Sequence, residues 1–397
     1  MRVLLVDYSI GFGGATKSLG LVCQAMRAVE LRVLTCQQPE QYHRWYPGLP
    51  VHRFRRIVNY RSMGNAKALL GRSLGRVSLK AVAATDFAVS AANVVRVTRL
   101  LRRHRIDVVH LNNGFQPPEA IWAARLVGIP CVVHMRGFPP VDAVRRARPY
   151  VRKVIAISRS VAGAVAAGGY PPDDIPLVWD PVDLALFDRT AYEGAGVRNA
   201  RGIAEEDVAV GFFGRVVRWK GQLEFVRAAL GVLEQGARIR PVIVGDVSDG
   251  EEDYMDEVRA MVSGSRFADR FIFAGYQPEP AAYYHAMDVV VHFSIEPEPF
   301  GMVVPEGMAA GKPVIAADAG GPVEVIDTEV DGLLVPSGNV AALAVAMARL
   351  AGDPHLRSTL GAKARRKARG RFSIAHAARE TVRVYESALA KALPAPV

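Results

Sequence analysis

The sequence predicts an α/β protein built from two Rossmann-like domains that face each other across a cleft. Short runs of Val, Ile and Leu alternate with longer stretches of helical periodicity along most of the 397 residues. This series runs twice, and each half opens with a glycine-rich turn between a strand and a helix, at Gly11–Gly14 and at Gly211–Gly214. The length also exceeds that of one ordinary core, so two or three domains are expected.

Each half contains a series of short apolar runs, as is typical of strands in parallel α/β folds. The first half is predicted to contain five strands: Val3–Asp7, Arg32–Thr35, Val108–His110, Cys131–His134 and Val154–Ile157. The second half is predicted to contain six strands: Ala209–Phe213, Pro241–Val244, Phe271–Ala274, Val289–His292, Val314–Ala316 and Gly332–Val335.

The domain boundaries are predicted from the points at which the periodicity changes. It fades over Val182–Arg201, where Asp, Arg and Gly collect, and this segment is the expected linker. Residues 1–190 are therefore assigned to an N-terminal domain and 191–375 to a C-terminal domain. The last helix is expected at about Ile374–Ala392, and residues 376–397 can cross back to the N-terminal domain.

Composition indicates a globular protein in a reducing compartment. Half of the residues are hydrophobic and 8% are aromatic, which excludes a disordered chain. Cys23, Cys36 and Cys131 are widely spaced, without the spacing of a metal site, and are expected to be reduced thiols. The chain begins directly with a strand rather than a signal peptide, and polar residues interrupt the apolar stretch Ala81–Val97. We expect a cytoplasmic location, including peripheral attachment to the inner face of the cell membrane.

The most informative motif places two carboxylates, Glu298 and Glu306, on either side of a Phe-Gly turn at the expected start of a helix. Helix starts leave backbone N–H groups unpaired and carry a positive dipole end, so they attract phosphate and sugar oxygens. Carboxylates accept hydrogen bonds from the hydroxyls of a sugar or a ribose. The pattern favours a nucleotide-sugar site over the alternative, a capped surface helix with one stray acid.

Two further turns are candidate phosphate sites. Arg215 and Lys220 flank a short loop after a strand, where two cations can clamp a diphosphate in place of a metal; the alternative is a solvated basic loop. In the first half, Gly13 and Gly14 allow a backbone to approach a diphosphate at a helix start, although a tight structural turn explains them equally well. The dinucleotide fingerprint G-x-G-x-x-G is absent from this turn.

A series of motifs occurs in a fixed order between Gly211 and Pro336. It comprises Gly-Arg-x4-Lys-Gly at 214–221, Phe273–Tyr276, Ala286–Asp288, the glutamate pair, and Gly320–Glu324. In this order the motifs resemble the family 4 glycosyltransferases of GT-B fold, and the resemblance extends over most of the chain. It implies a retaining hexosyltransferase that uses a nucleotide-diphosphate sugar, such as a UDP- or GDP-sugar, without a metal or another cofactor.

The resemblance also implies roles for residues around the diphosphate. Gly13 and Gly14 are expected to face the diphosphate from the N-terminal domain, whereas Arg215 and Lys220 bind the phosphates from the other side. Glu306 is expected to accept hydrogen bonds from the ribose hydroxyls. No Asp-x-Asp motif suited to a metal–diphosphate bridge is evident.

Other positions correspond to the sugar and the base. The resemblance implies that Glu298 holds the hydroxyls of the donor sugar, and that backbone around Tyr276 meets the base. Nearby backbone N–H groups are those of Phe300, Gly301 and Met302. His134, at the end of a strand, is expected near the transferred sugar, although a strand-end histidine can be purely structural. His110 also ends a strand and Asn112 follows it, which places acceptor binding there as a further expectation.

The implied mechanism needs no enzymatic base. Arg215, Lys220 and the helix start stabilise the charge of the departing nucleoside diphosphate. An acceptor hydroxyl attacks the face from which the diphosphate leaves, and a phosphate oxygen takes its proton. Three alternatives remain: a GT-B sugar-nucleotide epimerase, a phosphorylase, and a catalytically silent partner that binds a nucleotide sugar.

The positive charge of the chain is concentrated in one segment. Residues 53–105 contain eleven Arg and two Lys against a single acid, while the net charge of the whole chain is +11. Arg72, Arg76 and Lys80 form a stripe at helical spacing, which predicts either a basic helix on an anionic membrane surface or a core helix with a solvated Arg face. A glycan or glycolipid acceptor, in polysaccharide or lipid-linked glycan assembly, fits this charge. Nucleic acid is disfavoured because aromatics are few and no binding motif occurs.

Overall fold

The computed structural model describes most of the chain and divides it into two compact units. The described residues are 1–8, 14–36, 42–43, 45–53, 75–247 and 250–390, with only the backbone described over 75–87. The first unit comprises Met1–Ile157, Val161–Val178 and the residues from Ala377 onward. The second unit comprises Ser158–Ser160 and Trp179–His376.

The first unit is built on a six-stranded parallel sheet with the strand order β3-β2-β1-β4-β5-β6. This is the order of doubly wound nucleotide-binding sheets, in which ligands bind at the carboxyl ends of the strands. Its strands are β1 (Arg2–Asp7), β2 (Glu30–Thr35), β3 (Val51–Arg53), β4 (Val108–Asn112), β5 (Cys131–Met135) and β6 (Lys153–Ala156).

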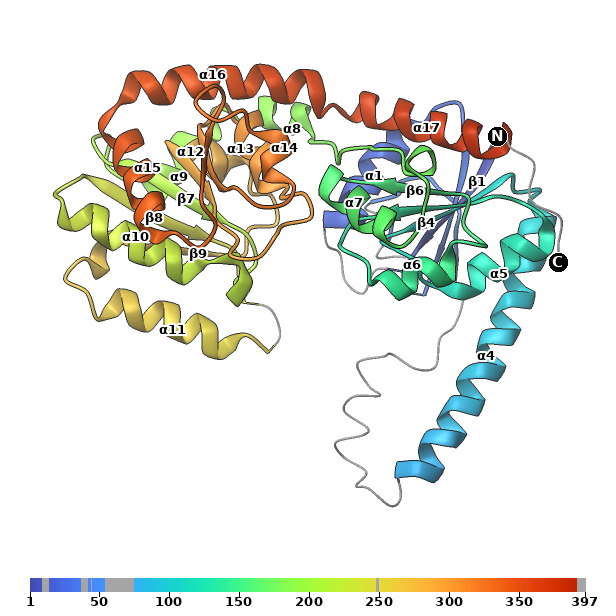
Figure 1. Cartoon of the computed structure of the whole chain (residues 1–397). Coiled ribbons are helices and arrows are strands. Elements are labelled where there is room, and N and C mark those ends of the chain that lie inside the picture. Colours follow the sequence, from blue (N-terminus) through green and yellow to red (C-terminus); the bar gives the residue numbers. More distant parts are fainter. Residues whose placement is uncertain (9–13, 37–41, 44, 54–74, 248–249, 391–397) are drawn as a thin grey trace. The chain divides into compact units, whose positions relative to one another are not determined.

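Helices cover both faces of this sheet (Figure 1). They are α1 (Gly14–Ala25), α4 (Gly75–Arg103), α5 (Pro118–Val127), α6 (Val141–Ala147), α7 (Arg159–Ala167) and the 3₁₀ turn η1 (Pro172–Asp174). Figure 1 shows α1 and the C-terminal helix α17 (Ile374–Ala390) on one side of the sheet, and α5 and α6 on the other. Leu19 of α1 and Tyr385 of α17 are buried in the same core as strand residues such as Val33.

The second unit repeats the architecture with the order β12-β11-β10-β7-β8-β9. Its strands are β7 (Val208–Phe213), β8 (Ile239–Val244), β9 (Ile272–Gly275), β10 (Val289–His292), β11 (Val314–Ala317) and β12 (Leu333–Val335). Its helices are α8 (Leu184–Arg189), α9 (Glu193–Ala200), η2 (Arg218–Lys220), α10 (Gln222–Glu234), α11 (Glu252–Ser263), η3 (Ala268–Arg270), α12 (Ala281–Ala286), α13 (Val303–Ala309), α14 (Pro322–Val325), α15 (Val340–Gly352) and α16 (Pro354–Arg371), and α17 begins in this unit.

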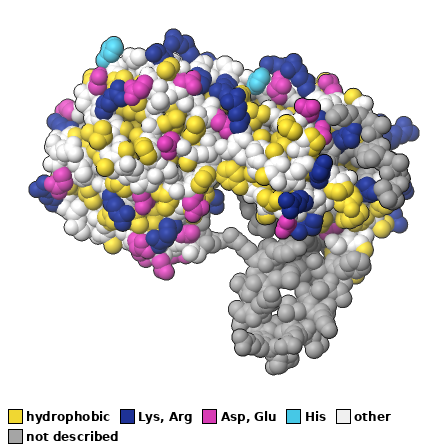
Figure 2. Space-filling model, viewed as in Figure 1, with side chains coloured by type: hydrophobic (Ala, Val, Ile, Leu, Met, Phe, Trp, Pro, Cys, Tyr) yellow, Lys and Arg dark blue, Asp and Glu magenta, His cyan; other side chains and the backbone are white. Residues whose placement is uncertain are grey.

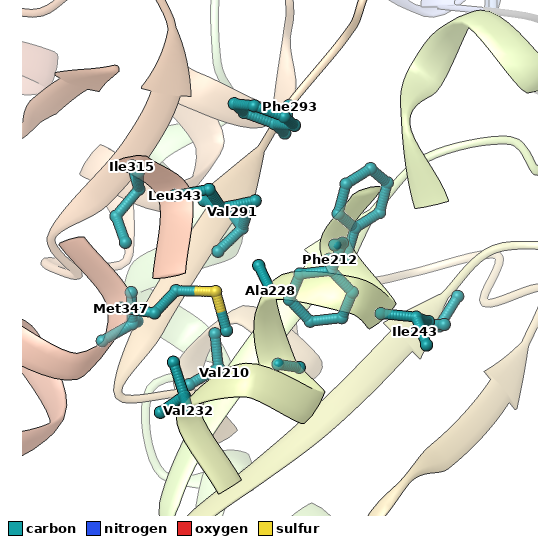
Figure 3. Close-up of a cluster of buried hydrophobic side chains, with 14 of the residues drawn as sticks. Val210, Phe212, Ala228, Val232, Ile243, Val291, Phe293, Ile315, Leu343 and Met347 are labelled. Atoms are coloured by element: carbon teal, nitrogen blue, oxygen red, sulfur yellow. The ribbon is translucent and has the colours of Figure 1, made fainter. Parts of the chain in front are cut away.

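The core of the second unit forms where α10 and α15 pack on one face of the sheet. Both helices are rich in Ala, Val and Leu, so their apolar stripes are buried against the strands. Figure 3 shows strand residues Val210, Phe212, Ile243, Val291 and Ile315 beside Ala228, Val232, Leu343 and Met347 of the two helices.

The two-sheet prediction is confirmed, and every predicted strand is present. Strand β3 was missed because two of its three residues, His52 and Arg53, are polar. The segment 182–201, where the linker is predicted, holds two short helices: α8, capped by the Asp183 carboxylate on the Leu186 N–H at 3.0 Å, and α9. Helices this short show little periodicity in a sequence.

Much of the basic segment lies outside the described residues. Residues 54–74, which include Arg72, are not described, and neither are the side chains of Arg76 and Lys80. The basic stripe therefore stays a prediction. The later part of α4 packs on α5, where Ser90 Oγ donates to Glu119 Oε1 at 2.5 Å. Among the described residues, no helix combines the length and apolar character needed to cross a membrane.

Candidate functional site

Glu298 lies in the loop between β10 and α13, where a glycine turn holds its backbone. The Gly321 N–H donates to the Glu298 carbonyl at 2.7 Å. Gly320 has φ +72°, and a Cβ added to it would lie 2.1 Å from the Glu298 carbonyl oxygen. Only glycine fits this contact, so the Gly-Gly turn of the motif shapes the Glu298 loop.

The Glu298 carboxylate is the centre of a buried polar cluster. Its Oε2 accepts hydrogen bonds from Lys220 Nζ and, at 3.0 Å, from Ser294 Oγ. His292 Nε2 lies 3.3 Å from the same oxygen. The side chains of Glu298 and Lys220 are only 12% and 13% exposed. Sequence analysis gave these two residues separate tasks, whereas the structure makes them one ion pair.

The electrostatics of this cluster keep Glu298 ionised. Burial by itself raises the pKa of the Glu298 carboxyl, but His292, 3.3 Å away, and Lys220 outweigh burial and hold the pKa at about 2. Burial lowers the pKa of Lys220, and the neighbouring Glu298 opposes that shift. Glu298 is therefore an acceptor at neutral pH, and the Lys220 ammonium keeps further N–H donors for another anion.

The loop that carries Arg215 and Lys220 is fixed against the end of β10. Gly221 has φ +84°, and an added Cβ would lie 2.2 Å from the Phe293 carbonyl oxygen. Gln222 Nε2 donates to the Arg215 carbonyl at 2.8 Å. Arg215 is exposed, and within the described part of the chain its guanidinium forms no ion pair. It is thus available to an incoming anion.

Glu306 lies in α13 and is oriented by a tyrosine that sequence analysis missed. Tyr284 Oη donates to Glu306 Oε2 at 2.8 Å. The Tyr284 ring stacks on Phe213, with centroids 3.8 Å apart. Burial, reinforced by Glu306, raises the pKa of Tyr284 well above its usual value, so its hydroxyl stays a donor. This arrangement leaves Glu306 partly exposed to accept other hydroxyls.

The other predicted site residues of this unit lie in the loop before α13, at its start, and after β9. The Phe300 side chain is buried against Phe372, with ring centroids 6.1 Å apart, so it contributes packing. Gly301 has φ +80°, and an added Cβ would lie 3.1 Å from His292 Nε2. The Met302 carbonyl accepts from the Glu306 N–H at 3.0 Å in the first turn of α13. Tyr276 follows β9 and is 69% exposed.

In the first unit, His134 belongs to a buried cluster at the carboxyl end of the sheet. Its ring stacks on that of His110, with centroids 5.6 Å apart. His110 Nδ1 lies 2.5 Å from Tyr385 Oη, and Arg136 Nη2 lies 3.3 Å from His134 Nδ1. Burial, assisted by Arg136, lowers the pKa of His110 to about 3 and that of His134 well below its usual value. Both rings are neutral at physiological pH.

The neutral His134 ring has a defined hydrogen-bonding direction. A guanidinium only donates, so His134 Nδ1 accepts from Arg136 and the proton resides on Nε2. Within the described residues, the buried Nε2 has no partner. Arg136 Nε also donates to Asn112 Oδ1 at 2.8 Å, and Asn112 Nδ2 donates to the Ala15 carbonyl at 3.3 Å. His134 thus presents an unused N–H donor.

The glycine turn of the first unit is described only in part. Gly14 begins α1, and no atom of the described residues lies within 4 Å of an added Cβ there, whereas Gly13 itself is not described. His292 and Ser294 were also missed, although a polar residue at the end of an apolar strand is the signal that identified His134. Tyr284 carries no such signal, because it lies in a short helix rather than at the end of a strand.

The chain resembles known glycosyltransferases in both halves. The family described as glycosyl transferases group 1 matches residues 197–367, and the glycosyl transferase 4-like domain matches residues 13–178. The lipopolysaccharide core biosynthesis mannosyltransferase LpcC of Rhizobium leguminosarum bv. viciae is 31% identical over 248 residues, covering 62% of this chain and 70% of that protein. The 2-deoxystreptamine glucosyltransferase of Streptomyces kanamyceticus is 28% identical over 374 residues, covering 87% and 93%.

Solved structures share the arrangement along nearly the whole chain. Anabaena Alr3699/HepE, in complex with UDP and glucose, superposes with a TM-score of 0.80 at 24% identity, covering 98% of this chain and all of that chain. A glycosyltransferase from Rickettsia africae ESF-5 superposes with a TM-score of 0.80 at 17% identity, covering 98% of both chains.

Proposed function

Because the chain belongs to the group 1 glycosyltransferases and has their two-domain α/β fold, GT-B, we propose that it transfers a hexose from a nucleotide-diphosphate sugar to a hydroxyl of a glycan or glycolipid, with retention at the anomeric carbon. The observation that carries this proposal is the buried cluster around Glu298, with Lys220 inside it and Arg215 exposed nearby. It combines acceptors for sugar hydroxyls with cations for a diphosphate.

The sugar, the ribose, the base and the diphosphate of the donor are each assigned to different residues. Glu298 accepts hydrogen bonds from hydroxyls of the sugar, and Glu306, oriented by Tyr284, accepts from the ribose. Backbone around Tyr276 meets the base, and the turn at Gly14 faces the diphosphate. The UDP complexes of the Anabaena neighbour support a nucleoside diphosphate as the leaving group.

The transfer exchanges one bond at the anomeric carbon for another. The bond from that carbon to the diphosphate oxygen breaks, and a bond to the acceptor oxygen forms on the same face. The acceptor proton passes to a phosphate oxygen of the leaving group. Lys220 and Arg215 stabilise the charge that develops there, so the chemistry requires no metal. His134 Nε2–H donates to the transferred sugar.

The acceptor is proposed to belong to cell-envelope or polysaccharide assembly at the cytoplasmic face of the membrane. The name of the mannosyltransferase LpcC supports this class of acceptor, as does the basic segment 53–105. Anionic groups on such an acceptor complement the positive charge of that segment.

The decisive experiment is donor turnover by the whole protein. UDP-glucose, UDP-N-acetylglucosamine and GDP-mannose are each incubated with the enzyme, and release of the nucleoside diphosphate is measured with and without glycan acceptors. We expect one donor to raise the Tm and to be turned over. Glu298→Gln should abolish turnover, while Glu252→Gln, an exposed acid on α11, should leave it unchanged.

Other outcomes would identify a different function or a different stereochemical course. A nucleotide sugar that binds but is never turned over identifies a catalytically silent partner. Release of a changed nucleotide sugar, with no glycosidic product, identifies an epimerase. An inverted anomeric signal in the NMR spectrum of the product contradicts the retaining mechanism.

A further inference from the structure

Helices α5 and α6 enclose a groove on one face of the first sheet, which we call the α5–α6 groove. It has a volume of about 430 Å³, and its walls include Phe115, Ile121, Trp122, Ala147 and Tyr150. Trp122 is 46% exposed, and its ring centroid lies 4.8 Å from that of Tyr150. Flat aromatic walls of this kind pack well against the apolar C–H faces of sugar rings.

A second cavity, the arginine pocket, shares Tyr150 with the groove. It has a volume of about 540 Å³ and is lined by Arg125, Arg148 and Arg152. The Arg125 guanidinium lies 5.1 Å from the centre of the Tyr150 ring. Within the described part of the chain, neither Arg125 nor Arg148 forms an ion pair, so two guanidinium groups remain to bind an anion.

The acid at this pocket is already neutralised. Asp174 lines the pocket, but its carboxylate pairs with Lys153 Nζ at 2.8 Å. Lys153 also donates to the Asp173 carbonyl at 2.7 Å, and its side chain is only 6% exposed, which fixes the pair in place. The pocket therefore keeps a net positive charge that suits a phosphate or a carboxylate.

Together, the α5–α6 groove and the arginine pocket extend from the carboxyl edge of the sheet to its amino edge. At one end, the Gly114 N–H donates to the His134 carbonyl at 3.0 Å, and Phe115 follows directly. At the other end, the pocket is lined by Gly128–Ile129 before β5 and by Val151–Arg152 before β6. A strand of five residues spans about 16 Å, the length of a few sugar units.

We propose that the α5–α6 groove holds the acceptor as an extended oligosaccharide, and that the arginine pocket binds a phosphate or carboxylate carried a few sugars from the reacting hydroxyl. The reacting end lies beside His134, and the anionic group lies at the opposite edge of the sheet. This inference rests on the proposed function and names its acceptor class. Figure 2 shows hydrophobic and basic side chains together on the face of the first unit where α5 and α6 lie.

The test compares a neutral and an anionic oligosaccharide. Maltotetraose and maltotetraose 1-phosphate are titrated into the whole protein with saturating UDP present, so that the donor phosphate site is filled. Tryptophan fluorescence reports occupancy, and Trp122→Phe should remove the signal. We expect the phosphorylated sugar to bind at least tenfold more tightly than the neutral one. Arg125→Gln combined with Arg148→Gln should remove that advantage.

A matched control separates the pocket from overall charge. Arg227→Gln combined with Arg238→Gln removes two exposed arginines of the second unit and should leave the binding unchanged. Equal affinity for the two sugars, or an advantage that survives in the Arg125 and Arg148 double variant, overturns the inference. Sedimentation with phosphatidylglycerol vesicles, without binding of either sugar, would overturn it in favour of a membrane surface. UDP binding in the same samples shows whether the proposed function stands independently.

Discussion

Glu298 is an ionised carboxylate in a buried position, where it contacts Lys220, His292 and Ser294. Removing one partner from a buried ion pair is costly, because it leaves the other charge uncompensated. The ion pair therefore has two consequences: it keeps an acceptor ready for sugar hydroxyls, and it makes local stability depend on the ionisation of Glu298.

The first prediction concerns Glu298→Gln. The carboxyl has a pKa of about 2 in the folded state against an ordinary value of 4.5, so its stabilising effect is complete above pH 4.5 and is lost as the pH falls toward 2. We expect the variant to lose on the order of 3 kcal/mol of unfolding free energy at pH 7. Urea unfolding at pH 7, 4 and 3 should show this difference shrinking with acid. A difference that does not change with pH would contradict it.

The second prediction concerns Tyr284→Phe. The change removes the hydroxyl that donates to Glu306 but keeps the ring stacked on Phe213. Loss of one hydrogen bond should raise the Kd for UDP by about threefold to tenfold, with little effect on the fold. Isothermal titration calorimetry measures it, with Tyr192→Phe, which is 79% exposed, as the control. An unchanged Kd would show that Glu306 needs no orienting donor.

At the level of single elements, Gly301 in the loop before α13 can be compared with Gly338, which lies between β12 and α15. Gly301 has φ +80° and faces His292 and Glu298 closely. Gly338 has a similar φ of +73°, but no atom in the described part of the chain lies within 4 Å of an added Cβ. An alanine would therefore be strained at both positions, whereas of these two only Gly301 would bring its methyl group into tight contact with His292 and Glu298.

The third prediction uses this pair. Gly301→Ala and Gly338→Ala should each cost about 1–2 kcal/mol of unfolding free energy, because an alanine is strained at positive φ. Only Gly301→Ala should also lower nucleoside diphosphate release, by at least tenfold, because its methyl group displaces His292 or Glu298. Thermal unfolding and donor turnover are measured on both variants. Equal loss of turnover in the two would point to general loosening instead.

At the scale of the whole molecule, the buried histidines of the first unit make stability depend on pH in mild acid. His110 and His134 are buried and neutral in the folded state, beside Arg136 and Tyr385, whereas the unfolded chain binds protons at both histidines below about pH 6.5. The contribution of these two histidines to stability is therefore complete above pH 6.5 and falls as the pH drops, because protons favour the unfolded chain.

The fourth prediction follows from this linkage. Between pH 7.5 and 5.5, the opening free energy of β4 and β5 should fall by about 2–3 kcal/mol, since each histidine contributes about 1.4 kcal/mol per pH unit below 6.5. Amide hydrogen exchange, corrected for intrinsic rates, measures it. His110→Asn should roughly halve the pH dependence, and His355→Asn, an exposed position, should not alter it. A pH dependence unchanged in His110→Asn would contradict this assignment.

The sequence by itself determined the two α/β series, the strand positions and the glutamate motif, because apolar runs and glycine turns are local properties of a chain. It could not determine side-chain partners. Lys220 meets Glu298 from 78 residues away, and Tyr385 meets His110 from 275 residues away. Strand order and helix packing bring such groups together, and neither leaves a periodic signal. Only the tertiary structure decided, for the same reason, that Glu298 is a buried ion-pair partner and that a groove lies between α5 and α6.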